Sequence, residues 1–103
     1  MDKKDKLDVR VASPEKVLWE GQAFAVSSKN SQGKFDILPH HTSFLTIVED
    51  QPIKIINRPK KVLQDFRFPR ALIYNRNNRV SIYTLESSEN RGLRTEDGIE
   101  NGS

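Results

Sequence analysis

The chain has 103 residues, no cysteine and a formal net charge of +3 at pH 7. A chain of this length forms one domain around a single modest core, and the lack of cysteine excludes disulfides and thiolate metal sites. No stretch is apolar for long enough to cross a membrane, and the first residues, MDKKDK, have no apolar signal core, so we expect any membrane association to come through a partner.

The N-terminal part predicts two short strands joined by a turn. Residues 7–11 alternate apolar and charged side chains, as a half-buried strand does. Ser-Pro-Glu at residues 13–15 is typical of a turn. Residues 17–20 favour a second strand, which we expect Gly21 to interrupt. Trp19 could be an aromatic that binds a ligand, but a small sandwich needs large side chains inside it, so we favour a core position.

A β-hairpin is predicted next along the chain. Residues 22–28 favour a strand with Phe24 and Val26 on one face. The polar residues 29–32 are expected to form the loop of this hairpin. The loop should end at Gly33, because glycine readily adopts the positive φ that a tight reversal requires.

The second arm of this hairpin is the most distinctive part of the sequence, GKFDILPHH at residues 33–41. Because side chains alternate along a strand, Phe35 and Ile37 are expected on one face. Lys34 and Asp36 then face the other way. The proline of this run has no N–H for a sheet ladder, so the strand is expected to end there. The arm therefore presents polar groups at its tip and at its far end.

The remaining strands follow at close spacing. The Asn-rich run at residues 75–78 separates two of them and predicts a hairpin turn, because asparagine tolerates left-handed geometry. With about nine short strands and no convincing helical period, the sequence predicts an all-β fold, a small antiparallel β-sandwich or flattened barrel. The strands expected in this half are residues 43–48, 53–56, 62–68, 72–74 and 80–83.

The composition changes after residue 86. Residues 87–103 contain only Leu93 and Ile99 as apolar side chains. Such a segment buries too little apolar surface to offset its ordering entropy. We therefore expect a β-sandwich domain at residues 1–86 and a disordered polar tail at residues 87–103.

The predicted domain is more basic than the whole chain. The tail holds two basic and four acidic side chains, which leaves the domain with a charge of +5. A basic domain can bind nucleic acid. However, Arg10, Lys54 and Arg67 lie between apolar neighbours in strand-like runs, as they would on the solvated face of a sheet. We therefore expect no nucleic-acid partner.

Three motifs resemble those of one family, in the same order and at similar spacing. The Gly-x-Phe-x-Ile-Leu-Pro-x-His pattern within residues 33–41 is similar to the signature loop and strand of the epsilon subunit of the F1 ATP synthase, called delta in mitochondria. SPEKVLWEG at residues 13–21 resembles the opening pattern of that family, and NRVSI at residues 78–82 its closing strand. The resemblance implies a β-sandwich, in agreement with the strand pattern.

The resemblance also implies a function, that of a non-catalytic rotor subunit of the F-type ATP synthase. In the family, the sandwich binds the gamma subunit and the polar loops of the membrane c-ring, and it couples ion-driven rotation to ATP synthesis. The expected location is the cytoplasmic face of the bacterial plasma membrane. Residues 87–103 are too few and too polar for the helical C-terminal domain of longer members. Neither the inhibitory role nor the nucleotide site of that domain is carried over.

The same resemblance implies that the hairpin contacts the c-ring. Asp36 stands where the family usually has glycine, which is expected to stiffen the arm or alter its backbone. Lys34 takes a position that is often acidic, so its partner on the ring is expected to differ, a carboxylate being one option. His41 has two open roles, a contact near the ring or a structural histidine. The expected contact residues are Ser31, Gln32, Gly33, Lys34, Phe35, Asp36 and His41.

No pattern in the sequence predicts catalysis. His40 and His41 are adjacent in an extended segment and point to opposite sides, so they cannot readily share one metal ion. The serine pairs at residues 27–28 and 87–88 lack a neighbouring base, and the carboxylates are scattered. We expect a chain that is not an enzyme and holds no cofactor or metal. The alternative from another class is a free-standing β-sandwich adaptor that no longer assembles with the rotor.

Overall fold

The computed structural model describes residues 6–57 and 61–85. These residues form nine strands and no helix, so none of them forms an apolar helix that could cross a membrane. The predicted boundary at residue 86 and the predicted tail at residues 87–103 lie outside the described residues. The strands are β1 (Leu7–Ala12), β2 (Val17–Ala23), β3 (Ala25–Asn30), β4 (Gly33–Ile37), β5 (Phe44–Val48), β6 (Pro52–Asn57), β7 (Lys61–Arg67), β8 (Ala71–Arg76) and β9 (Arg79–Thr84).

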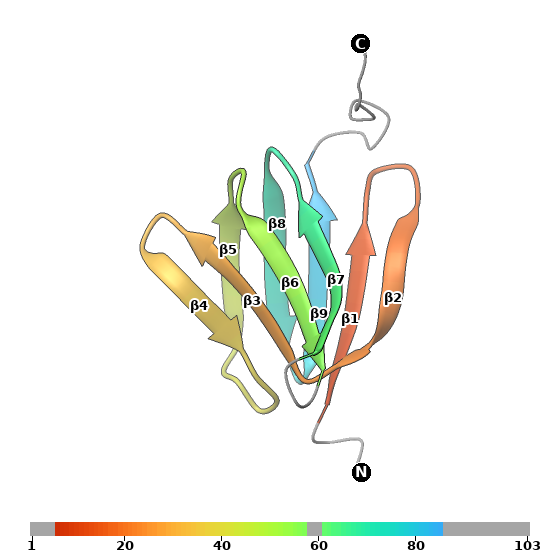
Figure 1. Ribbon diagram of the computed structural model, residues 1–103, viewed down its shortest axis with the longest axis vertical. Helices are drawn as coiled ribbons and strands as arrows, with labels where there is room; N and C mark the ends of the chain where they lie inside the picture. Colours follow the sequence, from red (N-terminus) through yellow and green to blue (C-terminus); the bar gives the residue numbers. More distant parts are fainter. Residues whose placement is uncertain (1–5, 58–60, 86–103) are drawn as a thin grey trace.

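The strands form two sheets that pack face to face as a β-sandwich, which confirms the predicted fold class (Figure 1). The five-stranded sheet has the order β2-β1-β9-β8-β5, and the four-stranded sheet has the order β4-β3-β6-β7. Aliphatic side chains from the two inner faces fill the space between the sheets. The buried core residues are Leu7, Val9, Val11, Ala23, Val26, Ile37, Val48, Ile53, Ile55, Ala71, Ile73, Val80 and Ile82.

One strand pair in this sandwich is parallel. β1 and β9 run side by side with Asp8 opposite Arg79 and Ala12 opposite Tyr83. The other pairs are antiparallel. Side-chain alternation is the same in both kinds of pair, and hairpin signals concern only strands that are neighbours in sequence. The sequence pattern therefore could not reveal that β1 lies between β2 and β9.

The expected break at Gly21 is wrong. β2 continues through Gly21, which lies opposite Val9, and it ends at Ala23. The chain bends at Phe24 instead, so that β2 and β3 belong to different sheets. The N–H of Phe24 donates to the carbonyl of Ile56 at 2.8 Å, where the pairing of β3 with β6 begins.

The predicted Asn-rich hairpin is confirmed, but its turn is only two residues long, because residues 75–76 belong to β8. The turn also connects other elements. Asn77 and Asn78 both have positive φ, 53° and 63°. The carbonyl of Asn78 accepts a hydrogen bond from the N–H of Asp8 at 2.8 Å. The Oδ1 of Asn78 accepts another from the N–H of His40 at 2.6 Å. This hairpin therefore holds both the start of β1 and the connection between β4 and β5.

Candidate interaction surface

The β3–β4 tip, defined as residues 29–34, is a tight hairpin turn. Asn30 and Gly33 lie opposite each other, so only Ser31 and Gln32 form the loop, which is shorter than the four residues expected. The φ of Gly33 is 122°, which confirms the positive value expected there. The Oδ1 of Asn30 accepts a hydrogen bond from the N–H of Gln32 at 2.8 Å. The turn is thus held by local contacts, and the side chains of Ser31 and Gln32 remain exposed.

The strand β4 fixes the direction of the tip. Ile37 is completely buried and Phe35 is half-buried, on the inner face as predicted. The ring of Phe35 lies 5.2 Å from that of Phe44 on β5. On the outer face, Asp36 accepts a hydrogen bond from the hydroxyl of Ser27, its cross-strand neighbour on β3. The departure from the family pattern at Asp36 therefore adds a bond between the two arms.

Lys29 lies directly opposite Lys34 in the register of β3 and β4. Both side chains are exposed. The loop expected at residues 29–32 would leave Lys29 without this neighbour, so the expectation is wrong at Lys29. Because the loop has only two residues, the pairing continues as far as Asn30 and brings the two lysines together. Lys29 therefore joins Lys34 on the candidate surface.

A groove of ≈ 400 Å³ lies beside the tip. The Nδ2 of Asn30 donates to the Oγ1 of Thr46 on β5 at 3.0 Å, which joins the tip to the other sheet. Across the groove, the Nε of Arg70 lies 3.6 Å from the Oε2 of Glu49. The groove therefore offers charged and hydrogen-bonding groups next to one apolar side chain. Its lining residues are Lys29, Asn30, Ser31, Ile47, Glu49, Gln51 and Arg70.

His41 lies away from the tip, beyond the other end of β4. The β3–β4 turn and the β4–β5 connection lie at opposite ends of this strand (Figure 1). Its five residues separate the two by about 16 Å. The ring of His41 packs edge-on against Phe44, with ring centroids 5.8 Å apart, and its Nδ1 lies 2.9 Å from the carbonyl oxygen of Thr42. The structural role considered for His41 is thus supported by these contacts, while a contact with the ring stays a prediction.

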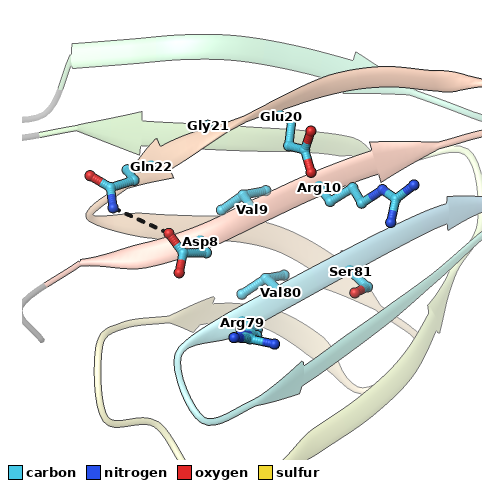
Figure 2. Close-up of a pocket in the computed structure, with 9 residues that line it drawn as sticks. All are labelled: Asp8, Val9, Arg10, Glu20, Gly21, Gln22, Arg79, Val80 and Ser81. Atoms are coloured by element: carbon cyan, nitrogen blue, oxygen red, sulfur yellow. Dashed lines mark hydrogen bonds between the residues drawn. The ribbon is translucent and has the colours of Figure 1, made fainter. Parts of the chain in front are cut away.

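A second groove, of ≈ 460 Å³, lies on the outer face of β2, β1 and β9 (Figure 2). Arg10 lies between Glu20 on β2 and Ser81 on β9, and the Nε2 of Gln22 donates to the Oδ1 of Asp8 at 3.2 Å. Its ionisable lining residues are Asp8, Arg10, Glu20 and Arg79. Across residues 6–57 and 61–85, no three His, Cys, Asp or Glu side chains gather as a metal site requires.

Apolar side chains are exposed on the outer face of the five-stranded sheet, on the side of its edge strand β5. Leu45 and Ile47 are 61% and 49% exposed. Tyr74 lies opposite Leu45, and Leu72 lies between Ile47 and Tyr83. These side chains form one contiguous surface, which we call the β5–β8 face. An exposed apolar surface of this kind typically marks a protein contact.

The fold and these surfaces define a small two-sheet β-sandwich domain that is suited to binding other proteins. Residues 6–88 match the family described as ATP synthase, Delta/Epsilon chain, beta-sandwich domain. Because the match spans most of the chain, the chain belongs to this family. The resemblance seen in the three sequence motifs is thereby confirmed.

The curated relatives include several ATP synthase epsilon chains. That of Leptospira borgpetersenii serovar Hardjo-bovis is 33% identical over 79 residues, which cover 77% of this chain and 61% of the relative. That of Micrococcus luteus is 36% identical over 50 residues, which cover 48% of this chain and 55% of the relative. The matched part of the chain thus spans less than two thirds of the length of these relatives.

Two solved structures contain chains with a similar fold. One is the cryo-EM structure of the Euglena gracilis mitochondrial ATP synthase, OSCP/F1/c-ring in rotational state 1, with a TM-score of 0.70 and 12% identity over 81% of this chain and 52% of that chain. The other is the Tetrahymena thermophila mitochondrial ATP synthase central stalk and c-ring, with a TM-score of 0.63 and 19% identity over 93% of this chain and 78% of that chain. At these identities, the likeness concerns the fold.

Proposed function

We propose that this chain is a non-catalytic rotor subunit in the central stalk of an F-type ATP synthase. It fixes the gamma subunit to the c-ring, so that ring rotation driven by ion flow reaches the catalytic head and supports ATP synthesis. The family and the names of the curated relatives support this proposal, and so does the likeness in fold to chains of ATP synthase stalk and ring assemblies. The proposal requires no cofactor or metal.

The observation that carries the proposal is a polar tip held firmly at one end of a packed sandwich. Ser31 lies in the two-residue loop of a hairpin, and Lys34 lies at the start of its second arm, β4. This arm is fixed by the buried Ile37 and by the hydrogen bond from Ser27 to Asp36. A densely packed core deforms little under load. Such an arm can transmit torque from a ring loop to the rest of the domain.

We assign the ring contact to the β3–β4 tip. The exposed Ser31 and Gln32 can form hydrogen bonds with polar ring loops, and Lys34 can form a charge pair. His41 lies beyond the other end of β4 and so requires a contact separate from the one at the tip. In this arrangement, the domain lies at the cytoplasmic face of the bacterial plasma membrane, where the ring holds it.

We assign the gamma contact to the β5–β8 face. Its exposed leucine, isoleucine and tyrosine side chains gain roughly 25 cal/mol for each Å² of apolar surface that a partner covers. Ile47 belongs to this face and also lines the groove beside the tip. The two proposed contacts are therefore neighbours, and one small domain can bridge gamma and the ring.

Co-purification tests this proposal. When the tagged chain is expressed with the gamma subunit and c-ring of its own complex, we expect all three to be recovered together. Ile47→Asp should reduce the recovery of gamma at least tenfold. Val62→Asp is the matched control, because Val62 is similarly exposed, at 47%, but lies on β7 in the other sheet. Recovery of the chain without gamma and the ring would overturn the proposal and favour a free-standing adaptor.

A further inference from the structure

Two like charges face each other at the β3–β4 tip. Lys29 and Lys34 are cross-strand partners, and both are exposed. Like charges in directly opposite positions destabilise a sheet. Neither ammonium group has an ion-pair partner among residues 6–57 and 61–85. The domain thus presents two unpaired ammonium groups side by side, at the end that the proposed function directs toward the ring.

Neither lysine forms an ion pair with the two carboxylates nearby. Asp36, on the same face of β4 as Lys34, accepts the hydroxyl of Ser27. Glu49, which lines the same groove as Lys29, lies 3.6 Å from Arg70. As far as the described part of the chain shows, both lysines are therefore available to an acid on a partner.

We propose that Lys29 and Lys34 together bind one carboxylate on an exposed loop of the membrane ring, an inference that rests on the proposed function. Cross-strand neighbours have Cα atoms about 5 Å apart, so two flexible lysine side chains can each reach one oxygen of the same carboxylate. Binding of the carboxylate would give two charge-assisted hydrogen bonds, one to each ammonium group. The groove beside Lys29 leaves room for the residues that flank the acid.

The charge pattern favours a single protein carboxylate over a lipid surface. Segments that bind anionic headgroups usually carry four to eight clustered basic residues. The tip carries two lysines, with Asp36 and Glu49 close by. Arg67 lies at the end of β7 and is already in an ion pair, with its Nε 3.0 Å from the Oδ1 of Asp50. This mixed surface would be repelled in part by a uniformly negative membrane.

Zero-length carbodiimide cross-linking of membranes that contain the assembled complex tests this inference. The reagent joins a lysine amine to a carboxylate only where the two are in contact, and arginine does not react. We expect a covalent product between this chain and the ring subunit, with Lys29 or Lys34 linked to an aspartate or glutamate. Lys29→Arg with Lys34→Arg should reduce its yield at least tenfold, because the guanidinium groups do not react. Lys29→Gln with Lys34→Gln should abolish the product and weaken ATP-driven pumping.

Lys54→Arg is the matched control, because Lys54 is exposed on the same sheet but lies opposite Asp65. It should leave the yield unchanged. Gamma and the ring could co-purify while the cross-linked product is absent, or while its yield is the same in the double arginine variant. Either result would show that the inference is wrong, and the proposed function would stand. If gamma and the ring do not co-purify, the proposed function itself fails. Binding of the isolated chain to vesicles of phosphatidylcholine and phosphatidylglycerol, lost in the double glutamine variant, would assign the lysines to lipid and overturn the inference.

Discussion

The indole ring of Trp19 lies over Gly21, two residues further along β2. Its Cη2 and Cζ2 atoms are both 2.9 Å from the position that a Cβ atom at Gly21 would occupy. Trp19 is half-buried and packs against the core, which is the position that the sequence favoured. Gly21 thus leaves room for a large ring on the inner face of an edge strand.

We expect Gly21→Ala to lower the free energy of unfolding by about 1–3 kcal/mol, because the new methyl group would overlap the indole ring. Urea denaturation followed by circular dichroism measures this change. In a Trp19→Leu background the same substitution should cost clearly less, since the ring is gone. Equal costs in the two backgrounds would show that the indole is not the cause.

The bond between Ser27 and Asp36 predicts a stiffer arm than the usual family glycine would give. Asp36→Gly removes the bond and adds backbone freedom, so we expect a loss of about 1–2 kcal/mol. Amide hydrogen exchange along β4 should become faster in this variant. Ser27→Ala should cost less, since it removes the bond alone, and the two effects should not add. Unchanged exchange along β4 would argue against a stiffening role.

Asn75 holds the connection between β4 and β5 from inside the fold. It is 1% exposed, and its Nδ2 donates to the carbonyls of Thr42 at 3.0 Å and His41 at 3.4 Å. Asn75→Asp would place a carboxylate against these oxygens, so we expect a loss of at least about 3 kcal/mol at pH 7. At pH 4 the loss should be smaller, because a protonated carboxyl can donate and the folded state binds that proton more tightly.

Urea titrations of this variant at the two pH values measure the difference. Asn75→Ala is the control for the pH dependence. It should cost about 1–3 kcal/mol at both pH values, because it leaves the carbonyls without a donor and adds no titratable group. A pH-independent loss in the aspartate variant would contradict this account of Asn75.

Reversing one charge at the tip should change the stability of the isolated domain and the pumping by the assembled complex in opposite directions. Lys34→Glu places an acid opposite Lys29, so the isolated domain should gain about 0.2–1 kcal/mol. In the assembled complex, the same variant should weaken ATP-driven pumping, because the tip would then repel the acidic ring loop. Lys61→Glu, also exposed but at the start of β7, should leave pumping unchanged. Equal pumping in the two variants would count against the ring assignment.

Much of the fold could be predicted because local rules and tertiary structure agree in most strands. The alternation at β1 and β4 marked the buried faces correctly, and the asparagines at residues 77–78 marked a turn that needs positive φ. The prediction failed at Gly21, where the glycine accommodates a neighbouring ring instead of ending the strand. That cause is a contact in space, which strand propensity does not contain.

The candidate site was predicted less completely, because register decides which residues meet. The motif identified Lys34, but Lys29 became its neighbour only when the loop proved to be two residues long. A four-residue loop would have left Lys29 unpaired. The separation of His41 from the tip likewise follows from the length of β4, which the motif alone does not provide.

The parallel pairing of β1 with β9 has a consequence for how the protein is made. β1 leaves the ribosome before β9, so it finds one of its two neighbours only after the strands between them in sequence have emerged. Closing so long a loop costs chain entropy before any contact offsets it, so the final folding step should be slow. Until residue 84 has emerged from the ribosome, one edge of β1 has no strand to pair with, and chaperones can bind the nascent chain there.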